Sequence, residues 1–278
     1  MPYCILSILQ LICMSGLLLD YNFQEHVASD VGIDDKYLPA SAYNLQGNLN
    51  QISQWTSDNL MQINAKKCNY MIFSRSKTSI STRLTMNDKV LERKGEQKIL
   101  GVWISDDLSG GGVSWSRNCK EICIRAYSRM SMLTKLKYIG TKTEDLIDIY
   151  VLYIRSLAEY CSVAFHSSLT VEQSNKIERI QRTCLKVILG DMYIDYTSAL
   201  EMTGLVTLPD RRAKRCLNFA LKSIKHERNS LLFPLNSTPG IFNRQSEIFT
   251  VNFSSGSAYR DSAIPFCQRL LNRYFHDK

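Results

Sequence analysis

The chain changes its hydrophobic spacing at one point, and this change limits the folds that are open to it. Before the glycine-rich stretch "SGGGV", Ser109–Val113, short apolar runs alternate with turn residues. After it, from Trp115 to His226, apolar residues recur at intervals of three and four, as in amphipathic helices. The pattern predicts an α+β fold in which an α/β part is followed by a mainly helical part. The glycine-rich stretch is expected to be a flexible insert between them.

The first part has one helical segment and several strand-like ones. Helical spacing is shared by four apolar residues, Leu45, Leu49, Ile52 and Trp55. The segments "CNYMIFSRS" and "QKILGVWISDD" are each expected to form a strand, because they are rich in β-branched and aromatic residues. "LTMNDKVLER" has the form of a hairpin with Asn87 and Asp88 at its turn. We therefore predict one helix packed on a small antiparallel sheet within residues 31–108.

The second part carries repeated signals for helix starts and stops. One helix is expected over Cys119–Lys137, and another over "LIDIYVLYIRSLAEYCSVAF". Capping boxes are predicted at Thr141 with Glu144 and at Thr170 with Gln173, further starts at Asp195 and Pro209, and stops at Gly190 and Gly204. Residues 109–228 are therefore predicted to be helical. Residues 229–278 are expected to form a turn-rich tail with one short helix.

Positive charge is concentrated in the helical part. The chain carries a net charge of +8, and residues 115–228 hold 19 Lys and Arg against 12 Asp and Glu, an excess of seven. Such a balance favours an anionic partner such as nucleic acid, although a solvated basic face is the simpler alternative. The candidates for phosphate contacts are Arg179, Arg182, Lys186, Arg211, Arg212 and Lys214. We expect Tyr150, Tyr153 and Tyr160 in the core rather than as stacking platforms.

The cysteines and the N-terminal segment bear on location. Nine scattered cysteines without close pairs are typical of a reducing compartment, which predicts an intracellular protein. Residues 1–30 contain an apolar run, Cys4–Leu19, that is short for a membrane span and includes Gln10. No basic residue precedes it, so we expect a buried segment, with a signal peptide as the alternative and no membrane association.

Several segments, taken in order, resemble one known family. They are "IDDKYL", "LQGNLNQISQWTSDNLMQINAKKCNYMIFS", "KILGVWISDD", "IYVLYIRSLAEYCSVAFHSSL", "IERIQRTCLKVIL", "ALEMTGLVTLPDRRAKRC" and "YRDSAIPFCQRLLNRYF". This ordered set, spread over residues 31–278, resembles the C-terminal part of the reverse transcriptase (RNA-directed DNA polymerase) of LINE-type, non-LTR, jockey-like retrotransposons. The resemblance implies a partial polymerase palm over residues 31–108 and a thumb-like region over residues 109–228.

The resemblance also implies roles for single residues. Asp34 and Asp35 match the second pair of palm aspartates, which in the family lie on a turn and bind the catalytic Mg²⁺. Gly32 stands where the family usually has an aromatic residue. Lys67 matches a lysine near the incoming nucleotide, and Leu100-Gly101-Val102 matches the turn that grips the primer end.

The chemistry of the family sets the expected function. Two-metal phosphoryl transfer needs carboxylates from at least two strands. In the family the first essential aspartate lies well upstream of the Asp-Asp turn, and only 33 residues precede Asp34 here. We therefore expect a truncated, catalytically inactive remnant, which needs Mg²⁺ only if activity remains and binds RNA, DNA or RNA–DNA hybrid weakly. The alternatives are an active polymerase completed by a second chain and a helical module that binds a protein partner.

Overall fold

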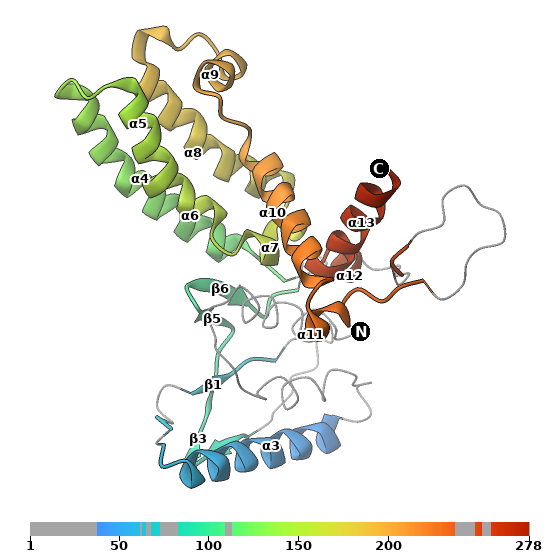
Figure 1. Ribbon diagram of the computed structural model, residues 1–278. Coiled ribbons are helices and arrows are strands. Elements are labelled where there is room, and N and C mark those ends of the chain that lie inside the picture. Colours follow the sequence, from blue (N-terminus) through green and yellow to red (C-terminus); the bar gives the residue numbers. More distant parts are fainter. Residues whose placement is uncertain are drawn as a thin grey trace. The chain divides into compact units, whose positions relative to one another are not determined.

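The protein divides into two compact units, residues 1–114 and residues 115–278 (Figure 1). The computed structural model describes residues 38–61, 63–64, 68–72, 83–108, 113–236, 248–251 and 257–277. The predicted N-terminal segment, residues 1–30, lies outside the described residues. The structure is mostly helical with small sheets, which agrees with the α+β class.

The first unit places the helix α3, Leu38–Asp58, against a hairpin. The side-chain amide of Gln46 makes two hydrogen bonds to the backbone of Thr85, donating to its C=O and accepting from its N–H, both at 2.9 Å. Beneath this contact, Leu84, Met86 and Leu91 are buried and Leu49 of α3 packs against them. The prediction of a helix on a small sheet is therefore confirmed in outline.

The sheet itself differs from the prediction. The strands are β1 (Asn69–Tyr70), β2 (Thr85–Met86), β3 (Lys89–Val90), β4 (Glu92–Arg93), β5 (Glu96–Ile99) and β6 (Val102–Ser105). They form three separate pairs, and the pair of β1 with β4 is parallel rather than antiparallel. The reason is that the β2–β3 hairpin ends at Leu91, whose N–H donates to the C=O of Leu84, and the chain then continues alongside β1.

Two tight turns connect the antiparallel pairs. Asn87 and Asp88 have φ values of 49° and 61°, which confirms the predicted hairpin turn and fits a two-residue type I′ loop. The segment "QKILGVWISDD", predicted as one strand, is instead a second hairpin, since Leu100 and Gly101 also have positive φ, 47° and 85°. Leucine is an uncommon residue in this conformation, so residue preferences predicted one continuous strand there, whereas the family resemblance placed a turn at Leu100-Gly101-Val102.

The second unit is a helical assembly. Its main helices are α4 (Ser116–Tyr138), α5 (Thr143–Ile149), α8 (Val171–Leu189), α9 (Tyr196–Thr203), α10 (Leu208–Ser223) and α13 (Ala263–His276). Figure 1 shows α4, α5 and α8 side by side, and their core contains Leu133, Leu146 and Ile180, all fully buried. The helices α4 and α8 run parallel, because Gln173 donates to Ser116 Oγ near one end and Lys137 Nζ donates to the C=O of Ile188 near the other.

Most helix ends follow the predicted signals. Thr170 and Gln173 form the predicted capping box of α8, Asp195 caps α9, and Pro209 lies in the first turn of α10 after its cap Thr207. The predicted cap at Thr141 is wrong, because α5 begins after Lys142 without a side-chain cap. The backbone N–H of Thr141 instead donates to the C=O of Leu136, which closes the preceding helix α4.

The long helix predicted over "LIDIYVLYIRSLAEYCSVAF", residues 146–165, is interrupted twice. It is π-helical over η4, Tyr150–Arg155, continues as α6, Ser156–Glu159, and then breaks at Cys161, whose φ is 52°. Short helical pieces follow, α7 (Ser162–Phe165) and η5 (His166–Ser168). These irregular elements bring Glu159 and His166 against α10, where both contact arginines.

The C-terminal segment packs into the helical unit. Within α13, Cys267 and Leu271 are fully buried, and α13 lies against α10. The side chain of Asn272 makes two hydrogen bonds to the backbone of Phe249, at 2.8 and 2.9 Å. The shorter elements of the unit are η6 (Gly190–Met192), α11 (Glu227–Ser230) and α12 (Ser257–Arg260).

Candidate nucleic-acid interface

The residues assigned by the resemblance to catalysis lie largely outside the part that can be described. Asp34, Asp35 and Lys67 are all outside the described residues. Leu100-Gly101-Val102 forms the β5–β6 turn, in which Leu100 is half-buried and Val102 is buried. Its role as a primer grip stays a prediction. Among the residues that the structure describes, no group of three or more His, Cys, Asp or Glu side chains is placed to hold a metal ion.

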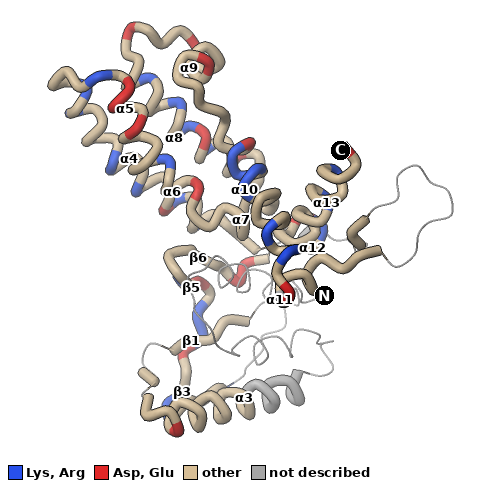
Figure 2. The backbone as a smooth tube through the Cα atoms, viewed as in Figure 1, with Lys and Arg blue, Asp and Glu red and all other residues tan. Residues whose placement is uncertain are grey.

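One face of α8 presents a row of cations. Lys176, Arg179, Arg182 and Lys186 recur at intervals of three and four residues and are all exposed. The opposite face is buried, with Ile177, Ile180, Cys184, Leu185 and Ile188 in the core. Because the apolar face fixes the rotation of the helix, the four cations must face solvent. We call these four residues the α8 basic row; Figure 2 marks the basic residues along the helix in blue.

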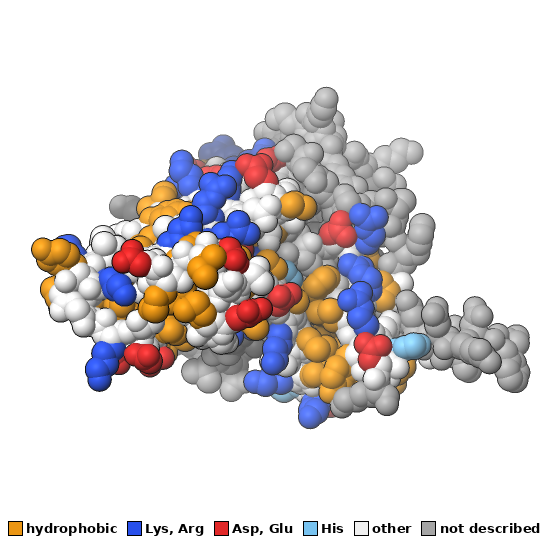
Figure 3. Space-filling model, turned by 90° about the horizontal axis from the view of Figure 1, so that it is seen from above, with side chains coloured by type: hydrophobic (Ala, Val, Ile, Leu, Met, Phe, Trp, Pro, Cys, Tyr) orange, Lys and Arg blue, Asp and Glu red, His pale blue; other side chains and the backbone are white. Residues whose placement is uncertain are grey.

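Glu172, in the first turn of α8, balances part of this charge. Its carboxylate lies 2.7 Å from Lys176 Nζ, one helical turn away, and both side chains are exposed. No acidic side chain contacts Arg179, Arg182 or Lys186 among the described residues. The three cations farther along the helix are therefore available to an anion. In the face drawn in Figure 3, basic side chains gather in groups with hydrophobic side chains between them.

Two tyrosines lie beneath this row, and sequence reasoning missed both. The Arg182 guanidinium lies 4.7 Å from the ring centroid of Tyr196, and Lys186 Nζ lies 5.4 Å from that of Tyr193. Both are cation–π contacts, which hold the cations while leaving them exposed. Tyr193 directly follows η6 and Tyr196 begins α9, and both of these elements pack on α8. Nothing local in the sequence indicates that packing.

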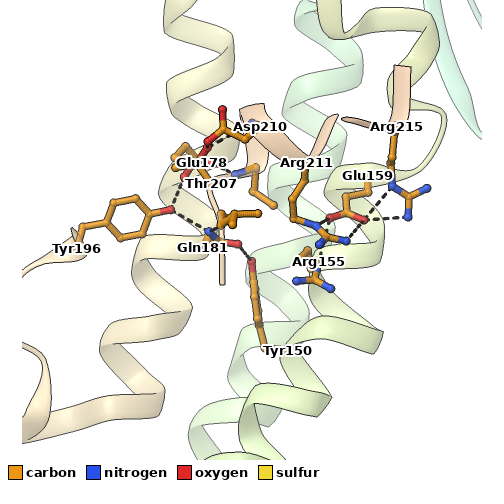
Figure 4. A network of polar contacts seen from close by, with 12 residues as sticks. Tyr150, Arg155, Glu159, Glu178, Gln181, Tyr196, Thr207, Asp210, Arg211 and Arg215 are labelled. Atoms are coloured by element: carbon orange, nitrogen blue, oxygen red, sulfur yellow. Dashed lines mark hydrogen bonds and ion pairs between the residues drawn. The ribbon is translucent and has the colours of Figure 1, made fainter. Parts of the chain in front are cut away.

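A buried polar network fixes the position of Tyr196 (Figure 4). Its hydroxyl donates to Glu178 and accepts from the amide of Gln181, and Gln181 in turn accepts from the hydroxyl of Tyr150 at 2.6 Å. Glu178 also accepts from the backbone N–H of Leu208, the first residue of α10. Burial and the Glu178 carboxylate raise the pKa of Tyr196, so its hydroxyl stays protonated as a donor. The network therefore ties α8, α9 and α10 together.

The other predicted tyrosines divide between core and surface. Tyr150 is fully buried, as expected. The expectation is wrong for Tyr153 and Tyr160, which are both 44% exposed. The π-helical segment changes the angular spacing of the side chains around the helix axis. Residues that would lie on one face of a regular α-helix therefore do not share a face here. The Arg129 guanidinium lies 4.1 Å from the ring centroid of Tyr153.

Arg212 is not a surface residue, and the expectation that it faces phosphates is wrong. Its side chain is fully buried, and its Nε donates to Nδ1 of His166 at 3.4 Å while its Nη2 donates to Ser174 Oγ at 3.0 Å. Burial lowers the pKa of Arg212, since the charged form is poorly solvated there. The residue connects η5, α8 and α10. Helical spacing in the sequence could not distinguish this buried arginine from its exposed neighbours.

Arg211 and Lys214, the remaining candidates, differ from each other. Arg211 is half-buried and donates through its guanidinium to Glu159, beside Arg155 and Arg215 (Figure 4). Lys214 is exposed. Of the six predicted basic residues, the structure brings Arg179, Arg182 and Lys186 together on one exposed face.

Comparison with known proteins assigns no family to the chain. No family model, no curated protein and no solved structure matches the chain. In the part of the chain that the structure describes, no helix combines the length and the apolar character needed to cross a membrane.

Proposed function

We propose that the helical unit binds the phosphate backbone of nucleic acid through the α8 basic row, and that the chain derives from a retrotransposon reverse transcriptase. The observation that carries the binding proposal is the alignment of four exposed cations on one helix face, of which only the first, Lys176, is paired with an acid among the described residues. The ordered segments that resemble the polymerase family support the origin. Lys and Arg contacts to phosphate carry no sequence information, so the binding should be independent of sequence.

The dimensions of the row fit this partner. From Lys176 to Lys186 the helix rises about 15 Å, at about 1.5 Å per residue. Along one strand of a duplex, phosphates follow at about 3.4 Å of helix axis, so the row spans roughly four of them. The cation–π contacts at Arg182 and Lys186 restrain two of the side chains before binding, which lowers the entropic cost of ordering them.

The salt dependence of binding tests the proposal. Arg179, Arg182 and Lys186 are to be replaced together by Gln, and affinity for an RNA–DNA hybrid measured by fluorescence anisotropy at several salt concentrations. Each neutralised phosphate contributes about −0.9 to the slope of log affinity against log salt on a duplex. Losing three contacts should therefore flatten the slope by up to about 2.7.

A matched control removes the same charge elsewhere. Arg125, Lys135 and Lys142 are exposed residues of α4 and the turn after it, and the change of all three to Gln lowers the net charge equally. The control should change the slope much less, with circular dichroism confirming that both variants are folded. Equal effects of the two triple variants, or binding that ignores salt, would favour the alternative of a helical module that binds a protein partner.

A further inference from the structure

Three arginines surround one buried carboxylate between α6 and α10 (Figure 4). The Glu159 side chain is 4% exposed. Arg211 donates to both of its oxygens, Arg215 approaches Oε2 with Nη2 at 2.9 Å, and Arg155 Nε lies 3.4 Å from Oε1. Burial alone would raise the pKa of Glu159, but the hydrogen bond from Arg211 and the three positive charges together hold that pKa below its usual value. The carboxylate is therefore ionised at neutral pH.

The charges in this cluster do not balance. One carboxylate meets three guanidinium groups, which leaves two positive charges in excess. The Arg155 side chain is only 10% exposed, and Glu159 is the one acid that contacts it among the described residues. Burial and the neighbouring Arg211 lower the pKa of Arg155, so its charged form is disfavoured there. An excess of like charge in a poorly solvated place is unfavourable unless an anion offsets it.

We propose that Arg155, Arg211 and Arg215 form a binding site for a phosphate-type oxyanion. Guanidinium groups offer forked pairs of donors that match the oxygens of phosphate. Arg211 is 30% exposed and Arg215 is 52% exposed, so an anion can reach them from solvent. Glu159 already holds the three side chains together, and binding therefore needs little ordering of the site. The site is separate from the α8 basic row and does not depend on it.

The test uses the full-length chain and inorganic phosphate, titrated by calorimetry in chloride buffer at constant ionic strength. The expected result is saturable binding that Arg215→Gln weakens about tenfold or more, as expected for the loss of hydrogen bonds to a charged group. Arg215 is the most exposed of the three, and Glu159 keeps two arginines in the variant. Lys225→Gln is the matched control, because it removes one exposed charge just after the end of α10 and should leave the affinity unchanged.

Two results would overturn the proposal. One is the absence of saturable phosphate binding at constant ionic strength, and the other is equal weakening by Arg215→Gln and Lys225→Gln. Competition identifies the source of the phosphate group: displacement by an oligonucleotide assigns the site to nucleic-acid phosphates, and its absence assigns the site to a free oxyanion. Phosphate binding that persists in the triple variant of the α8 basic row would support this site even if that row binds no nucleic acid.

Discussion

The contact between His166 and Arg212 should make the stability of the helical unit depend on pH. The Nδ1 atom of His166 accepts the hydrogen bond from Arg212, and its ring packs edge-on against Phe266, with ring centroids 5.5 Å apart. Burial and the positive charge of Arg212 lower the pKa of His166 from 6.5 to about 4. Protonation would also remove the acceptor and place a second positive charge beside the buried guanidinium.

The size of the effect follows from linkage. Between pH 6.5 and pH 4 the unfolded chain binds this proton and the folded chain does not, so stability falls as the pH falls through that window. The loss from this one group is about 2 kcal/mol between pH 7 and pH 5, and it approaches about 3 kcal/mol below pH 4. Domains of this kind are stable by only about 5–15 kcal/mol, so the effect should be measurable.

Urea unfolding at pH 7, 6 and 5 measures this loss of stability, and the wild type is compared with the variant His166→Gln. The Gln side-chain oxygen can accept a hydrogen bond from Arg212 but does not titrate, so the variant should lose about 2 kcal/mol less than the wild type over this range. His226→Gln, at an exposed histidine, is the control and should follow the wild type. Equal losses in wild type and His166→Gln would refute the assignment, because the pH dependence would then come from other groups.

Two further predictions concern the helical unit, and both can be measured by urea unfolding at neutral pH. Thr170→Ala removes the side-chain cap of α8 and should lower the free energy of unfolding by about 1 kcal/mol. Thr170→Ser keeps a hydroxyl at the cap and should retain most of this stabilisation. Tyr150→Phe removes the hydroxyl that donates to the buried side-chain oxygen of Gln181, and should lower the free energy of unfolding by about 1–3 kcal/mol. An unchanged midpoint in either variant would contradict the corresponding contact.

The features that the sequence predicted correctly are those that short stretches of chain determine. The capping box of Thr170 and Gln173, the cap at Asp195 and the stop at Gly204 each involve residues within one helical turn. Their side chains and φ values satisfy the backbone groups at the helix end without help from other elements. The same holds for the hairpin turn at Asn87.

Other features were not predicted from local patterns. Thr141 has the pattern of a cap, but its N–H is used to end α4, because Gly140 with a φ of 86° turns the chain back there. The turn at Leu100 has a residue that rarely adopts positive φ, within an otherwise apolar run. The π-helical segment leaves no signature in hydrophobic spacing.

The basic residues show why a count of charges over a segment overestimates a binding surface. The excess of seven over residues 115–228 includes Arg212, which is buried against His166 and does not face solvent. Replacing Arg212 would disturb its buried contacts, so a loss of binding in such a variant would report on folding. The α8 basic row is different, because its cations are exposed and the apolar face of the helix does not depend on them. A change in salt dependence there, with the fold intact, can therefore be attributed to lost phosphate contacts.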